Sequence, residues 1–154
     1  MSNPKKQRAQ TLTPNQIVAH NLRRARMLRG WTQEATATRL APLLGTHWSK
    51  ASFSAAERSV DSERIRQFTA DDLTAFAAIF ELPVGFFFMA PRGVERIGAP
   101  GATATLTPSE LAALAPLPEG LLEAIEAQMR ARMEVEFGVT VIDEPAEGGK
   151  EQTR

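Results

Sequence analysis

A short pattern recurs along the chain wherever a helix is expected to begin. An apolar residue is followed by Ser or Thr, then by polar or small residues, and then by a second apolar residue. The hydroxyl can accept a hydrogen bond from a backbone N–H in the first turn, and the two apolar side chains can pack across that turn. The pattern begins at Leu12, Trp48, Phe68 and Leu106, and it predicts four helix starts.

Apolar spacing, together with Gly and Pro, extends this prediction to seven helices. A Gly directly after a helical segment suits the left-handed residue that ends many helices, so we expect helix ends before Gly30 and Gly45. Pro42 should kink or shorten the last turn of the second helix. The expected helices are about Pro14 to Arg29, the residues after the Thr32 cap to Leu44, Lys50 to Arg58, Ala70 to Phe80, a short helix after Pro83 with Phe86, Phe87 and Phe88, Ser109 to Ala115, and Glu119 to Phe137.

Strand signals are weak, so the predicted fold class is all-α. The candidate strands are Val139 to Ile142 and Arg64 to Phe68, and the Pro, Gly, Ala and Thr residues between Ala90 and Thr105 have the composition of a linker. The expected organisation is a basic N-terminal arm (1–12), a helical domain (13–90), a linker (91–105), a C-terminal helical region (106–142) and a disordered tail (143–154).

Charge divides the chain into two parts of opposite sign. Residues 1–66 hold twelve Lys or Arg against four Asp or Glu, whereas residues 67–154 hold six against fourteen. Such a division indicates a polyanionic partner for the front part, although two simply solvated surfaces would have the same composition.

The residue inventory argues against an enzyme. There is no Cys, His20 and His47 stand in no metal-ligand spacing, and adjacent Asp71 and Asp72 suit a helix cap and its dipole. We therefore expect no catalytic residue, no cofactor and no metal.

No apolar run approaches the roughly 18 residues of a membrane span, and no apolar stretch of a secretory signal follows the basic start. A cytoplasmic protein without a membrane partner is expected.

The segment from Lys50 to Arg58 has the character of a helix that approaches another surface closely. Its outward positions are Lys50, Ala51, Ser54 and Ala55, whereas Phe53 and Ala56 should point inward. A helix enters the major groove of DNA only when its approach face is not bulky. A capped N-terminus at Ser49 would also direct the positive end of the helix dipole toward phosphates.

These residues lie within a longer stretch, Ile17 to Phe88, that resembles the Cro/C1-type helix-turn-helix regulators, also called the XRE family. Thr32-Gln33-Glu34 is similar to the start of that family's first motif helix, Ser49 to Arg58 to its recognition helix, and Leu73 to Phe88 to its closing pair of helices. The resemblance implies a five-helix domain with a C-terminal helical appendage.

The family pattern also implies residue roles. Gln33 would touch a phosphate and brace the first residue of the recognition helix, and Glu57 would pair with Arg26. Lys50, Ala51, Ser54 and Ala55 occupy its base-reading positions, and Phe53 occupies its core position. The candidate DNA-contacting residues are Gln33, Ser49, Lys50, Ala51, Ser54, Ala55, Arg58, Arg64 and Arg66.

The chain departs from the family pattern in two places. The turn at 41–48 is longer than the family's usual turn, and an extension at 59–67 follows the recognition helix. These insertions could add phosphate contacts through His47, Lys50, Arg64 and Arg66. The basic arm, with Lys5, Lys6 and Arg8, either follows the DNA or is an ordinary basic tail.

The predicted function is sequence-specific binding of double-stranded DNA, and hence transcriptional regulation, as a repressor. An apolar stripe on the last helix predicts either a homodimer or packing on the same chain; it comprises Leu122, Ile125, Met129, Met133 and Phe137. Two alternatives stay open. One is an antitoxin that binds its own operator and holds a basic toxin through the acidic C-terminal region, and the other is a protein-interaction module that does not bind DNA.

Overall fold

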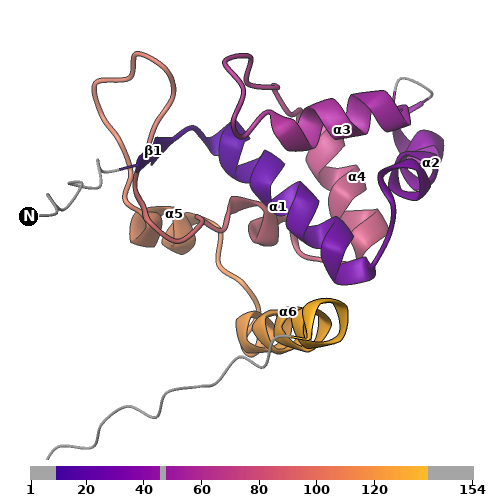
Figure 1. The fold of residues 1–154 in the computed structure, drawn as a ribbon. Coiled ribbons are helices and arrows are strands. Elements are labelled where there is room, and N and C mark those ends of the chain that lie inside the picture. Colours follow the sequence, from indigo (N-terminus) through magenta and orange to yellow (C-terminus); the bar gives the residue numbers. More distant parts are fainter. Residues whose placement is uncertain (1–9, 46–47, 139–154) are drawn as a thin grey trace, which may run out of the picture.

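A computed structural model describes residues 10–45 and 48–138, and in these residues the chain is mostly helical (Figure 1). Helix α1 crosses in front of α4, α3 lies above them and α2 beside them, while α6 lies below as a separate layer. The elements are β1 (Gln10–Leu12), α1 (Pro14–Arg29), α2 (Gln33–Leu44), α3 (Lys50–Arg58), α4 (Ala70–Phe80), the 3-10 helix η1 (Val84–Phe88), β2 (Val94–Ile97), α5 (Pro108–Leu114) and α6 (Leu121–Phe137).

Hydroxyl caps begin the helices where the sequence predicted them. Thr13, Thr69 and Thr107 each form a reciprocal capping box with the residue three positions on. The predictions for α1, α3 and α4 are confirmed at both ends. Gly30 ends α1 in the left-handed conformation, at φ 66°. Pro42 lies in the last turn of α2, and the helix nevertheless extends to Leu44.

Aromatic side chains fill the core that α1 to α4 and η1 share. Phe53, Phe76 and Phe87 are fully buried. Trp48 is 2% exposed, and its ring centroid lies 6.0 Å from that of Phe53 and 5.5 Å from that of Phe76. The contact between Trp48 and Phe53 confirms the predicted apolar pairing across the first turn of α3. It also anchors the beginning of α3 in the core.

A buried amide joins the end of the helical domain to α1. Asn21 is fully buried, and its Nδ2 donates to the carbonyls of Phe87, at 3.2 Å, and Met89, at 2.8 Å. These bonds satisfy backbone acceptors where η1 ends and hold the chain that follows η1 against α1.

The one strand prediction that falls within the described residues was wrong. Arg64–Phe68 is not a strand, and Val139–Ile142 lies outside the described residues. Instead, β1 from the expected arm pairs in parallel with β2 from the expected linker, with a register irregularity between Gln10 and Thr11. Strands of three and four residues with such an irregularity show no alternating pattern, and their partners are distant in sequence.

This small sheet belongs to a second apolar cluster that closes the fold. Leu12, Ile17, Val94, Ile97 and Leu111 pack together, which brings β1, α1, β2 and α5 into contact. The segment expected to be a linker is therefore partly structural. Residues 1–9 of the expected arm, His47 and the expected tail lie outside the described residues.

Helix α6 packs on the same chain through part of its apolar stripe. Ile125 is 3% exposed within the main core, with Leu121 and Met129 packed against that core. The side-chain amide of Gln128 donates to the Leu28 carbonyl of α1 at 3.1 Å. Leu122 and Met133 of the stripe stay 39% and 41% exposed. Between the two alternatives for this helix, packing on its own chain accounts for Ile125.

We predict that Ile125→Ala lowers the free energy of unfolding by about 2–5 kcal/mol, the usual cost of a large-to-small change in a core. Leu122→Ala, one turn earlier and exposed, is the matched control and should cost much less. Urea denaturation of the two variants measures the difference. Equal, small losses would mean that α6 contributes nothing to the core.

Candidate nucleic-acid interface

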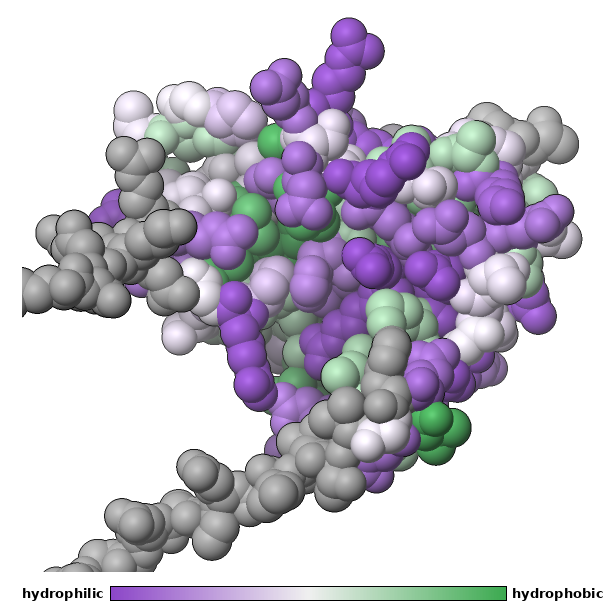
Figure 2. Space-filling view, in the orientation of Figure 1, coloured by the Kyte–Doolittle hydropathy of each residue, from purple (hydrophilic) through white to green (hydrophobic). Residues whose placement is uncertain are grey.

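Helix α3 separates its side chains into a buried side and an exposed side. Phe53, Ala56 and Glu57 are buried. The exposed row is formed by Lys50, Ala51, Ala55 and Arg58, with half-buried Ser54 between them. Figure 2 shows hydrophilic residues crowded over the α3 end of the molecule, at the top of the view. The exposed row thus combines two basic ends with a middle of small side chains.

The start of α3 is held by its cap. The Ser49 hydroxyl accepts from the backbone N–H of Ser52 at 3.2 Å and lies 3.1 Å from the Ser52 hydroxyl. Because Ser49 and Lys50 are exposed, the positive end of the helix dipole points toward solvent at this place. An anion can therefore approach the first turn without displacing a packed side chain.

A buried carboxylate fixes α3 to the two preceding helices. Glu57, 6% exposed, accepts from Arg26 Nε at 2.6 Å through Oε1 and from Arg26 Nη2 at 3.1 Å through Oε2. The side-chain amide of Gln33 also donates to Oε2, at 2.8 Å. Arg26 Nη1 donates to the Trp31 carbonyl at 3.0 Å, between α1 and α2. We call Arg26, Gln33 and Glu57 the Glu57 network.

The Glu57 network bears out the pairing of Arg26 with Glu57 and changes the expected role of Gln33. The resemblance implied that Gln33 braces the first residue of the recognition helix. Its hydrogen bond instead goes to Glu57 in the last turn of α3. A carboxylate has acceptor sites left after a bidentate Arg contact, and Gln33 is close enough to occupy one of them.

The two arginines after α3 have different surroundings. Arg64 is exposed. The Arg66 guanidinium lies 4.3 Å from the Trp48 ring centroid and 5.9 Å from that of Phe68. Arg66 therefore covers the aromatic core at the start of α3, and the structure does not bring it into the exposed row. Stacking on Trp48 gives it a structural role.

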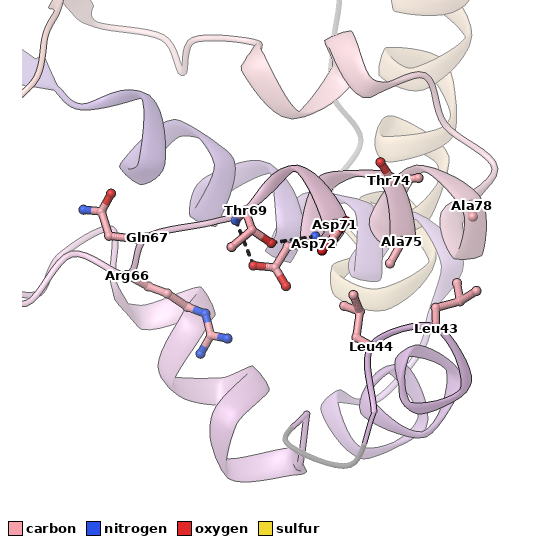
Figure 3. Close-up of a pocket in the computed structure, with 10 residues that line it drawn as sticks. All are labelled: Leu43, Leu44, Arg66, Gln67, Thr69, Asp71, Asp72, Thr74, Ala75 and Ala78. Atoms are coloured by element: carbon pink, nitrogen blue, oxygen red, sulfur yellow. Dashed lines mark hydrogen bonds between the residues drawn. The ribbon is translucent and has the colours of Figure 1, made fainter.

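Figure 3 shows Arg66 at the edge of a hollow of about 550 Å³ between α2 and α4. The carboxylate of Asp72 accepts from the Thr69 backbone N–H at 2.9 Å, and the Thr69 hydroxyl accepts from the Asp72 backbone N–H at 3.1 Å. The expected capping role of Asp72 is confirmed.

Across residues 10–45 and 48–138, no group of three or more His, Cys, Asp or Glu residues is placed to hold a metal ion.

Beside the exposed row, a smaller hollow of about 240 Å³ opens where α1, α2 and α3 meet. Arg23, Ser54 and Arg58 line it together with the Glu57 network and Asp61. Arg23 was missed as a candidate, because the sequence shows a basic run on α1 but not which of its members faces α3. Its exposed guanidinium extends the basic surface from α3 onto α1.

His20 lies on the same helix, and its pKa is lowered from the usual value. Burial is the largest cause, followed by the positive charges of Arg24 and Arg23, while Asp61 opposes the shift. A His with a lowered pKa is neutral at pH 7, so His20 adds no positive charge to this surface.

Comparisons of the chain with protein-family models, with curated proteins and with solved structures find no match. Among the helices of the described ranges, none is long and apolar enough to cross a bilayer. The functional assignment therefore depends on the geometry of α3 and its surroundings.

We predict that Glu57→Gln lowers the free energy of unfolding by about 3 kcal/mol, because it leaves the Arg26 charge half-buried without its partner. The matched control is Glu81→Gln in the Arg29–Glu81 pair. Arg29 Nη2 and Glu81 Oε2 are 3.3 Å apart and the Glu81 side chain is 80% exposed. A loss of about 0–1 kcal/mol in the free energy of unfolding is therefore expected for Glu81→Gln. Thermal and urea unfolding measure both. A Glu57→Gln variant as stable as the control would contradict a structural role for the network.

Proposed function

We propose that this chain binds double-stranded DNA by placing α3 in the major groove, and that it represses transcription. The observation that carries the proposal is the exposed row of α3, with small side chains between Lys50 and Arg58. A cytoplasmic location goes with this function.

The chemistry of the row suits the edges of base pairs. Ala51 and Ala55 let the helix backbone approach closely, and their methyl groups can contact the methyl group of thymine. Lys50 can donate to the acceptors of guanine, and Ser54 can donate to or accept from several bases. Sequence preference would come from these four positions.

The charges around the row suit phosphates. Arg23, Arg58 and Arg64 are exposed on α1, α3 and the segment after α3. Contacts of this kind fix the orientation of a protein on DNA without reading its sequence. The Glu57 network would hold α3 at one angle to these arginines, which gives the bases and phosphates a fixed spatial relation.

The test uses a duplex that the full chain selects from a random pool, with a scrambled duplex of equal length as control. Lys50→Ala should reduce the binding free energy by about 1–3 kcal/mol for the selected duplex and by much less for the scrambled one. Arg64→Ala should weaken both alike. If Lys50→Ala lowers the affinity for both duplexes equally, Lys50 contacts only phosphate, and the proposal that it contacts a base is wrong.

Salt dependence is a second readout of the same binding experiment. With about six phosphates neutralised, a plot of log K against log salt should have a slope near −5. A flat response would contradict the electrostatic part of the proposal. Absence of DNA binding altogether would leave the protein-interaction module or the antitoxin's toxin-holding role as the function to pursue.

A homodimer is the second part of the proposal. Because Ile125 already packs on its own chain, a partner would cover other apolar side chains of the C-terminal region, such as Leu114 and Val135, which are 72% and 86% exposed. A two-fold dimer would place two α3 helices on half-sites about one or two DNA turns apart.

Sedimentation equilibrium should therefore show a dimer for the full chain and a monomer for Val135→Glu, in which a charge replaces the exposed apolar side chain. Glu136→Gln, at the neighbouring exposed position, is the control and should still dimerise. If the unaltered chain sediments as a monomer, the dimer is wrong and the protein reads a single half-site.

A further inference from the structure

A groove of about 710 Å³ separates α6 from the middle of α1 and from the chain that follows η1. We call it the α1–α6 groove. Its lining includes the apolar side chains Met89, Met129 and Met133 and the charged side chains Arg24, Arg92 and Glu126. The volume lies within the range of pockets that hold small organic ligands, and the mixed lining suits a molecule with one charged end.

Arg24 is the unusual residue of this groove. It is half-buried, and its guanidinium lies 5.7 Å from the centroid of the buried Phe86 ring. Burial is the largest cause of the lowered pKa of Arg24; the charge of Glu126 opposes the lowering, and Arg92 adds a smaller contribution to it. Its charge is therefore partly removed from water.

In residues 10–45 and 48–138 this charge is in no described ion pair within 4 Å, although Glu126 is near enough to act on it. Arg24 belongs to neither of the ion pairs described above, Arg26–Glu57 and Arg29–Glu81. Glu126 is the acidic residue among those that line the groove. A half-buried guanidinium with a second Arg nearby and no carboxylate in contact is a favourable place for an added anion.

The methionines of the lining suit the rest of the ligand. Methionine side chains are flexible and adapt their shape to hydrocarbon, so three of them along one groove suit an apolar tail without a fixed shape. Glu126 would repel a ligand of high negative charge, such as a nucleotide, more strongly than a single carboxylate.

We propose that the α1–α6 groove binds an amphipathic monocarboxylate with a hydrocarbon tail of medium length. The carboxylate pairs with Arg24 and lies near Arg92, and the tail lies along Met89, Met129 and Met133. This site is separate from the exposed row of α3. The proposal does not depend on DNA binding, and its test contains no DNA.

Isothermal titration calorimetry of the full chain with decanoate tests the proposal. Decanol, which has the same tail without the charge, and acetate, which has the same head without the tail, should each bind at least about tenfold more weakly. Equal binding of decanol would show an apolar groove only, and absence of decanoate binding would overturn the proposal.

Variants distinguish the site from general attraction by a basic surface. Arg24→Gln and Arg92→Gln should each weaken decanoate binding, by about tenfold for Arg24. Arg23 is the adjacent residue of α1 and lies outside the groove. Arg23→Gln should therefore leave decanoate binding unchanged. Glu126→Gln should strengthen binding several-fold, because it removes the competing negative charge.

Thermal unfolding of each variant keeps these results interpretable. Arg92 and Glu126 are exposed, so their substitutions should fold even if loss of the Arg24–Phe86 contact destabilises Arg24→Gln. Equal weakening by Arg23→Gln and Arg92→Gln, or no strengthening by Glu126→Gln, would contradict a specific carboxylate site.

Discussion

The position of α3 depends on one buried carboxylate. Glu57 lies in the last turn of α3 and accepts hydrogen bonds from Arg26 of α1 and Gln33 of α2, while Trp48 anchors the opposite end of the helix in the aromatic core. A helix held at both ends has a defined direction. A carboxylate in this place also specifies its partners more narrowly than an apolar side chain would, because each of its hydrogen bonds requires a donor at a fixed angle.

The parts beyond the helical domain extend its core. The β1–β2 sheet and α5 close one end through the cluster around Ile17, and α6 covers α1 through Ile125. Both contacts lie on elements other than α3, so the exposed row stays open to solvent. The fold thus supports α1 from several sides, and α1 in turn supplies Arg26 to the Glu57 network.

Local chemistry explains which elements could be predicted from the sequence. The capping residues Thr13, Ser49 and Thr69 act on backbone groups within one turn, so the pattern alone located the starts of α1, α3 and α4. The pairing of β1 with β2 could not be predicted, because it joins two very short segments that are about eighty residues apart in the sequence. Packing of α6 on its own chain depends on the same kind of long-range contact.

The candidate interface was predictable to a similar extent. Helical spacing separated the outward Lys50, Ala51 and Ala55 from the inward Phe53, and the structure confirms that division. Spacing could not show that Arg66 stacks on Trp48, or that Arg23 lines the hollow beside Ser54, since both depend on how elements meet in space.

The most direct test of the account is whether the exposed row of α3 contacts bases. Alanine methyl groups report this by nuclear Overhauser effects in a complex of the full chain with its selected duplex. The account predicts contacts from the Ala51 and Ala55 methyl groups to major-groove protons, and none from exposed Ala112 on α5. Contacts from Ala112 with none from Ala51 or Ala55 would contradict it and would place the DNA, if bound, on another surface.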